Sequence, residues 1–156
     1  LSSGIMRSLE RTLGKESYPV LETFVEDIVS ASSIIVRGEG EAESYSALLR
    51  ESIEKFYPEK KIIWNPQGEE EADLCLAVSI TGKEKLTMDS ISRVVFAGGK
   101  ADVISANPQS LISKAATNAI QVSDELFFKG DEHILGKFSI LAVIEILTVL
   151  MGKDKV

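Results

Sequence analysis

The residues with the clearest chemical potential lie in one stretch, where an apolar run ends in small hydroxylated residues and a glycine. Ser79 and Thr81 carry hydroxyl groups, and Gly82 allows the backbone to approach a ligand closely. The helix expected after Gly82 would add free N–H groups and the positive end of its dipole, and Lys83 would add a mobile cation. This combination favours an anion-binding loop over the alternative, an ordinary turn between a strand and a helix.

A second glycine-rich turn follows an earlier apolar run. Gly38 and Gly40 are separated by one residue, as in the first part of a dinucleotide-binding fingerprint. Glu43 stands where the third glycine of that fingerprint belongs, so the pattern is a weak nucleotide signal. We therefore expect no nucleotide cofactor.

A metal site is also not expected from the sequence. Glu39, Glu41 and Glu43 could bind a hard cation through their carboxylate oxygens, but solvated charges are the simpler interpretation. The chain has one cysteine, Cys75, and one histidine, His133, which is too few for a zinc site. His133 is instead a candidate acid or base, because the unperturbed pKa of histidine lies near neutrality.

The composition indicates a single acidic domain. With 156 residues and 44% hydrophobic content, the chain can form one compact core. We expect N-terminal helices in residues 1–32, a sheet core in residues 33–124 and a C-terminal helix in residues 130–152. A net charge of −7 argues against a nucleic-acid partner, which would need a basic face. The single cysteine fits the reducing cytoplasm, so we expect a cytoplasmic protein.

Short apolar segments alternate with helical patterns along the chain. Asn107 and Pro108 predict the cap and first residue of one helix, and Asp131 or a neighbour is expected to cap the last one. Alternating strands and helices predict a parallel sheet with right-handed crossovers. The expected strands are residues 34–36, 61–64, 74–78, 102–105 and 119–122, and the expected helices are residues 5–13, 17–29, 45–56, 84–97, one from residue 107 and one after residue 131.

Over roughly residues 15–152, the order of these segments resembles the SIS (sugar isomerase) domain family. Residues 34–40 resemble its first strand and Gly-x-Gly turn, residues 76–82 its Ser/Thr-rich phosphate loop, and residues 102–122 its later strand, helix and final strand. The resemblance implies a three-layer αβα sandwich with a five-stranded parallel sheet in the flavodoxin-like order 2-1-3-4-5. It also implies a sugar phosphate ligand, bound by Ser79, Thr81, Gly82 and Lys83 beside the turn containing Gly38 and Gly40.

The same resemblance implies candidate catalytic residues at two positions. In 6-phospho-3-hexuloisomerases a catalytic glutamate opens the last helix region, where this chain has Leu135 and Gly136. The phosphoheptose-isomerase type opens that helix with Glu-x-His, and Glu132-His133 is similar. Its partner glutamate falls within one position of Glu51. The candidate catalytic pair is therefore Glu51 and His133.

Two functions are compatible with these features. The first is an aldose–ketose isomerase acting on a sugar phosphate, in which Glu51 or His133 moves a proton between adjacent carbons. The second is a non-catalytic sugar-phosphate sensor or regulatory subunit. The missing glutamate at the last helix and the acidic first loop favour the second function.

The last helix has an unusual distribution of apolar residues. Between Ile134 and Met151 they cover most of the helix circumference, and Lys137, Glu145 and Thr148 form a narrow polar strip. The run is marginal in length for a membrane span and contains two charges, so we expect a core helix and no membrane partner. We also expect a second subunit to pack on it, and the family resemblance implies a homodimer or homotetramer.

Overall fold

The structure is a computed structural model that describes residue 14, residues 17–122 and residues 132–156. Within the last helix, side chains are described from residue 138 onward. The expected helix over residues 5–13 and the cap at Asp131 lie outside the described residues.

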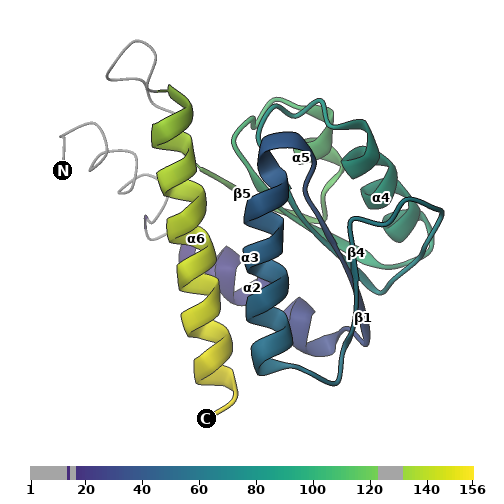
Figure 1. The fold of residues 1–156 in the computed structure, drawn as a ribbon, viewed down its shortest axis with the longest axis vertical. Helices are drawn as coiled ribbons and strands as arrows, with labels where there is room; N and C mark the ends of the chain where they lie inside the picture. The colour runs from purple at the N-terminus through teal and green to yellow at the C-terminus, as the bar shows by residue number, and fades with distance from the viewer. Residues whose placement is uncertain (1–13, 15–16, 123–131) are drawn as a thin grey trace.

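A five-stranded parallel sheet forms the centre of the molecule, in the order β2-β1-β3-β4-β5 (Figure 1). This confirms the predicted α/β fold class and strand order. The strands are β1 (Ser33–Arg37), β2 (Lys61–Trp64), β3 (Leu74–Ser79), β4 (Lys100–Ser105) and β5 (Asn118–Gln121).

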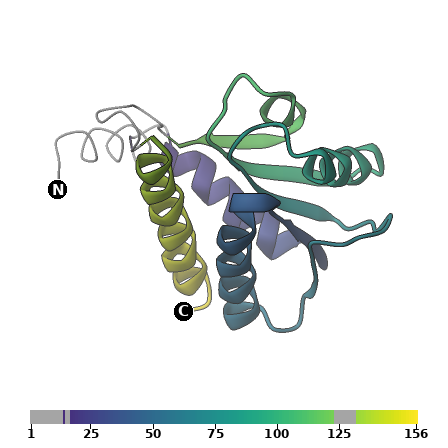
Figure 2. The same ribbon diagram turned by 45° about the horizontal axis from the view of Figure 1, so that its top comes forward.

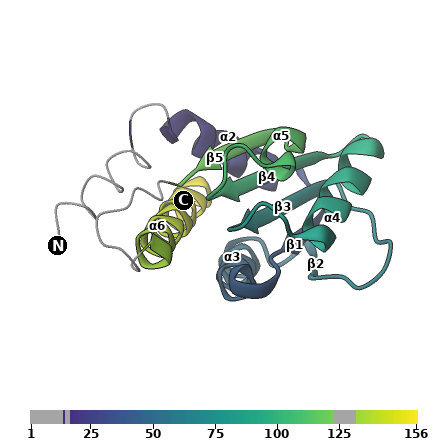
Figure 3. The ribbon, with the colours of Figure 1, turned by 90° about the horizontal axis from the view of Figure 1, so that it is seen from above.

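Helices cover both faces of the sheet. Helices α2 (Ser17–Ser30), α3 (Glu43–Phe56) and α6 (Glu132–Asp154) lie on one side, and α4 (Lys85–Phe96) and α5 (Leu111–Ala115) lie on the other (Figure 2). A short 3-10 turn, η1 (Gly40–Ala42), precedes α3. The view from above shows α3 and α4 on either side of β1 and β3 (Figure 3).

The central strand β3 explains why its sequence lacks polar alternation. Leu74, Leu76 and Val78 pack against the α2, α3 and α6 side, whereas Cys75 and Ala77 pack against the α4 and α5 side. All six residues of β3 are buried. A strand that is covered on both faces favours apolar side chains at successive positions, which is the pattern from Leu74 to Val78.

One side of helix α6 packs into the core, as expected for a core helix. Ile140, Val143, Ile144, Leu147 and Met151 are buried within the subunit. Hydrogen bonds add to this packing, because the hydroxyl oxygens of Ser52 and Thr148 are 2.7 Å apart and the Tyr57 hydroxyl donates to Asp154 at 2.7 Å. No helix in the described part of the chain has the length and apolar character needed to cross a membrane.

The predicted start of the helix after β4 is wrong. Helix α5 begins at Leu111, and its cap is Ser110, whose side-chain oxygen accepts a hydrogen bond from the Ser113 N–H at 3.2 Å. Asn107 instead accepts from the Gln109 N–H at 3.2 Å and donates to the Thr81 carbonyl at 3.0 Å. Asn107 therefore links two loops at the same edge of the sheet.

A buried polar cluster joins α2 to β4 and β5. The Asn118 amide donates to Asp102 at 3.0 Å and to Asp27 at 3.3 Å, and the Lys100 ammonium lies 3.2 Å from Asp27. Asp102 is fully buried, and one of its carboxylate oxygens has no hydrogen-bond partner in the structure. Burial, reinforced by the neighbouring Asp27, raises the pKa of Asp102 to about 8.

We predict that Asp102→Asn stabilises the protein at alkaline pH relative to the parent. Because the folded state holds the Asp102 proton more tightly than the unfolded state, this contribution to stability is complete below the ordinary pKa of 3.8 and is lost as pH rises towards about 8. Between about pH 5 and pH 8, the parent should lose more than about 1 kcal/mol of unfolding free energy relative to the variant. Urea denaturation at both pH values measures this difference.

The exposed Asp89 gives a matched control, since Asp89→Asn removes a carboxylate from the surface of α4. That variant should follow the parent at both pH values. A constant stability difference between the parent and Asp102→Asn across this range would contradict the raised pKa.

Candidate functional site

The candidate site lies at the carboxyl ends of β1 and β3, where the chain leaves two adjacent strands in opposite directions. Arg37 of β1 is paired with Ala77 of β3, so the loops that follow the two strands share one edge of the sheet. Glu39 in the first loop accepts a hydrogen bond from the Thr87 N–H in the first turn of α4. The two loops are therefore adjacent, as the strand order implies.

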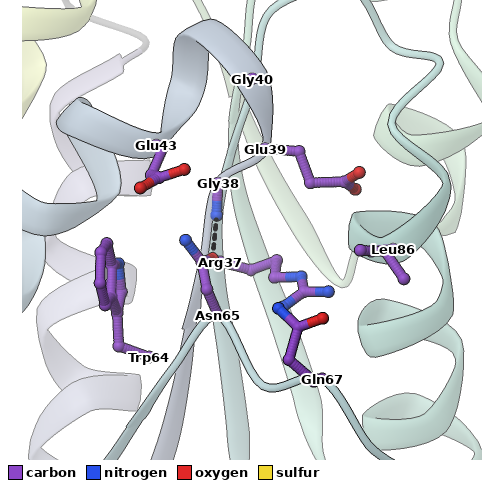
Figure 4. Close-up of a pocket in the computed structure, with 9 residues that line it drawn as sticks. All are labelled: Arg37, Gly38, Glu39, Gly40, Glu43, Trp64, Asn65, Gln67 and Leu86. Carbon is purple, nitrogen blue, oxygen red and sulfur yellow. Dashed lines mark hydrogen bonds between the residues drawn. The ribbon is translucent and has the colours of Figure 1, made fainter.

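A pocket of about 440 Å³ opens at this edge (Figure 4). Its lining combines one guanidinium, two carboxylates, two side-chain amides and an indole ring, so it offers hydrogen-bond donors, acceptors and an apolar surface. The lining residues are Arg37, Gly38, Glu39, Gly40, Glu43, Trp64, Asn65, Gln67 and Leu86.

Close packing around Gly38 fixes the backbone that lines this pocket. A side chain at Gly38 would collide with the Ala42 carbonyl and the Ser46 side chain. The Gly38 N–H donates to the Asn65 side-chain oxygen at 2.9 Å (Figure 4). Asn65 has a φ of 44°, a left-handed conformation that asparagine adopts more readily than most residues. The loops after β1 and β2 are thus fixed to each other.

Arg37 is a buried cation in the wall of this pocket. Its side chain is 2% exposed, and its Nη1 donates to the Pro66 carbonyl at 2.7 Å. Its Nε has no hydrogen-bond partner, and no carboxylate of the described residues forms an ion pair with it. Cys75, whose pKa is influenced by Arg37, is a neutral thiol, because burial raises its pKa to about 12.

The loop after β3 has the geometry of an anion cradle, and a side chain of the same chain fills it. The Glu84 carboxylate accepts hydrogen bonds from the Ser79 hydroxyl at 2.8 Å and from the N–H groups of Ile80 at 2.9 Å, Thr81 at 3.2 Å and Gly82 at 3.0 Å. We call these four donors the anion cradle. An external anion can use the cradle only if Glu84 leaves it.

These hydrogen bonds control the ionisation of Glu84. Burial acts to raise its pKa, but the hydrogen bonds from the Ser79 hydroxyl and from backbone N–H groups outweigh burial and lower the pKa below its ordinary value of 4.5. Glu84 is therefore a carboxylate at neutral pH. Its charge also lies favourably at the N-terminus of α4.

The structure places the residues predicted to bind phosphate as follows. Thr81 and Lys83 are exposed, and the Thr81 hydroxyl oxygen accepts from the Lys83 N–H at 3.1 Å. Gly82 has a φ of 80°, and a side chain there would collide with Ser110. Ser79, in contrast, is fully buried, so its hydroxyl does not face solvent.

The predicted catalytic residues lie outside the Arg37 pocket or outside the described side chains. Glu51 lines a separate groove of about 240 Å³ between α3 and α6, together with Leu48, Leu141 and Glu145 among others. His133 belongs to the first turn of α6, and its side chain lies outside the described residues. A catalytic role for this pair remains a prediction.

Two charged residues of the site, Glu84 and Arg37, were missed in the sequence, although each leaves a signal. Residues 81–84 match the pattern Ser/Thr-x-x-Glu, in which a carboxylate folds back onto free N–H groups at a helix start. Arg37 is a charge at the end of the otherwise apolar run Ile34–Val36. A charged residue continuing a buried strand indicates a specific partner.

Comparisons with known proteins establish the fold. No protein-family model matches the sequence, and no curated protein is similar to it. Among solved structures, the Vibrio vulnificus NanR protein complexed with ManNAc-6P is similar with a TM-score of 0.80 and 17% identity, over 97% of this chain and 60% of the NanR chain. This chain thus spans less than two thirds of that protein.

Two further solved structures have a similar fold. The sugar isomerase domain of an RpiR transcription factor from Sphaerobacter thermophilus has a TM-score of 0.77 and 14% identity, over 97% of this chain and 87% of that one. A Methanococcus jannaschii protein with an inferred 3-hexulose-6-phosphate isomerase function has a TM-score of 0.70 and 12% identity, over 97% and 86%. The chain has the fold of a SIS domain.

We predict that Glu84→Gln destabilises the fold at neutral pH, because one carboxylate oxygen that accepts N–H groups becomes an amide that cannot. The expected loss is about 1 kcal/mol of unfolding free energy, as for the loss of an intramolecular hydrogen bond. Since the folded pKa is lowered, the contribution of Glu84 is present above 4.5 and is lost as pH falls through the folded value.

Urea denaturation at about pH 7 and about pH 3 tests this, with the exposed loop variant Glu71→Gln as control. The difference between the parent and Glu84→Gln should narrow at the lower pH. Equal stability of the two proteins at neutral pH would show that the Glu84 hydrogen bonds contribute nothing.

Proposed function

We propose that this chain is a SIS-type domain that binds a sugar phosphate without isomerising it, as a sensor or regulatory domain. The observation that carries the proposal is the 440 Å³ pocket at the β1–β3 edge, with its buried Arg37. Open parallel sheets bind ligands at this position. Two of the similar structures are described with a sugar phosphate as ligand or substrate, which supports this class.

The other lining residues suit the sugar part of such a ligand. The Asn65 and Gln67 amides can both donate and accept hydrogen bonds, and Glu43 can accept them from hydroxyl groups. Trp64 offers ring surface, and its position is fixed by the Arg50 guanidinium 4.3 Å from its centroid and by a 3.1 Å hydrogen bond to Ser46. Rings of this kind pack against apolar faces of small ligands.

The non-catalytic assignment is supported by the position of Glu51. A general base must reach the proton that it removes, directly or through one water. Glu51 follows Glu43 by eight residues on α3, which is roughly 12 Å along the helix, and it lines the α3–α6 groove. A ligand in the Arg37 pocket is therefore out of its reach within one subunit.

The isomerase alternative has one supporting observation. Glu43 lines the same pocket as Arg37, so a carboxylate base and a polarising cation are both available to a ligand there. Under this alternative, the proton would be moved by Glu43 rather than by Glu51.

We also propose that a second copy of the chain packs on α6. Phe138, Leu141 and Val149 are 44%, 38% and 55% exposed, and they surround the exposed Glu145 on one face of the helix, next to Leu48 of α3, which is 40% exposed. A largely apolar face beside a groove suits a two-fold contact between identical subunits. Val143 is fully buried within its own subunit, so Val143→Glu would test folding instead of assembly.

We predict that sugar phosphates stabilise the protein and that the protein does not isomerise them. Glucose 6-phosphate, ribose 5-phosphate and sedoheptulose 7-phosphate would be tested by thermal shift against the free sugars. A ligand at about 100 times its Kd adds about 2.7 kcal/mol of unfolding free energy. Proton NMR of the same mixtures should show no aldose–ketose conversion.

Conversion that is lost in Glu43→Gln and retained in Glu51→Gln would establish the isomerase alternative. If no sugar phosphate stabilises the protein more than its free sugar, the proposed function is wrong.

The second prediction concerns assembly. Leu141→Glu should shift a dimer to a monomer in light scattering, because it places a charge in an apolar contact. Leu111→Glu is the matched control, since Leu111 is 72% exposed on the opposite side of the sheet. A monomeric parent at micromolar concentration would contradict the proposed contact.

A further inference from the structure

We infer that the acid group of the ligand binds to Arg37 in the pocket at the end of β1, and not to the anion cradle after β3. This inference rests on the proposed function, because it names the part of the site that takes the phosphate group. It also departs from the sequence-based expectation that residues 79–83 hold the phosphate.

The anion cradle already has an occupant. The Glu84 carboxylate uses the Ser79 hydroxyl and the N–H groups of Ile80, Thr81 and Gly82. A tethered group competes at a high effective concentration, because its binding is intramolecular. An incoming phosphate must displace this carboxylate and would then lie beside its charge, which disfavours binding in the cradle.

Arg37, in contrast, is a cation without a matching anion. Burying a charge is costly unless it is paired and hydrogen-bonded. Arg37 is 2% exposed, its Nε has no partner, and its Nη1 donates to a neutral carbonyl, that of Pro66. A planar guanidinium presents several N–H donors in a fork that matches phosphate oxygens.

The nearest candidates for an internal counter-ion do not fill this role. Glu39 lines the same pocket, but its carboxylate accepts the Thr87 N–H at the start of α4. Cys75 is a neutral thiol. Glu43 is exposed at the other side of the pocket from Arg37 in Figure 4. The guanidinium therefore remains available to an acid group that enters from solvent.

The same arrangement orients the ligand. Glu39 and Glu43 repel an acid group from their part of the pocket, and both can accept hydrogen bonds from hydroxyl or amino groups. The phosphate end of a sugar phosphate thus faces Arg37, and the hydroxyl-rich end faces the carboxylates. The ligand class is a small molecule with one acid group and several hydroxyl groups.

The experiment compares Arg37→Met with Glu84→Gln by isothermal titration of the three sugar phosphates named above and of inorganic phosphate. Arg37→Met should bind the stabilising sugar phosphate about ten- to a hundred-fold more weakly, since it loses charge-assisted hydrogen bonds. Its unfolding temperature without ligand should be equal to or higher than that of the parent, because an unpaired buried charge is removed. Glu84→Gln should bind with the affinity of the parent.

Arg37→Lys is the second variant, in case Arg37→Met does not fold. It retains the charge and loses the fork, so its affinity should lie between those of the parent and Arg37→Met. A role of Arg37 in folding alone would lower the unfolding temperature of these variants without changing the ligand affinity.

The outcomes separate this inference from the proposed function. If Arg37→Met binds as tightly as the parent and Glu84→Gln binds more tightly, the phosphate uses the anion cradle, and the inference is wrong while the proposed function stands. If the parent binds no sugar phosphate, the proposed function fails. In that case, inorganic phosphate binding that is lost in Arg37→Met would still support an acid-binding site at Arg37, and its absence would overturn the inference as well.

Discussion

The arrangement of the candidate site depends on which acceptors bind the backbone N–H groups in the loop before α4 and in its first turn. The first N–H groups of a helix have no partner inside the helix, and they carry the positive end of its dipole. In this chain Glu39 from the loop after β1 accepts the Thr87 N–H in the first turn of α4, and Glu84 accepts the N–H groups of the loop that leads into the helix. The donors that a SIS-type sheet would present to a ligand at this position are therefore occupied by carboxylates of the same chain.

This internal neutralisation changes the electrostatics of the neighbouring pocket. With Glu84 held in the anion cradle and Glu39 at the start of α4, Arg37 is the cation that faces the pocket without an anionic partner among the described residues. A buried guanidinium in that state costs stability in the absence of a ligand. A ligand that supplies the counter-charge would account for this buried guanidinium at the end of β1.

Much of the fold could be predicted from the sequence, because burial on two faces leaves a local signal. The unbroken apolar run of β3 and the stripes of α2 and α3 follow directly from which side chains touch the sheet. The start of α5 could not be predicted in this way. Asn107 and Ser110 are both good caps, and the choice depends on a hydrogen bond from Asn107 to Thr81, which is distant in sequence.

The sequence predicted the donor groups of the anion cradle, but it did not predict that Glu84 fills the cradle. Hydroxyl groups, a glycine and a helix start do form an anion cradle after β3, and sequence reasoning identified Ser79, Thr81 and Gly82 as its parts. Residues 81–84 also match the capping pattern Ser/Thr-x-x-Glu, in which the chain provides its own anion. A phosphate and a carboxylate of the chain itself can use the same donors, so residue types alone cannot distinguish the two occupants. What distinguishes them here is the position of one side chain, because the Glu84 carboxylate lies 2.8 Å from the Ser79 hydroxyl.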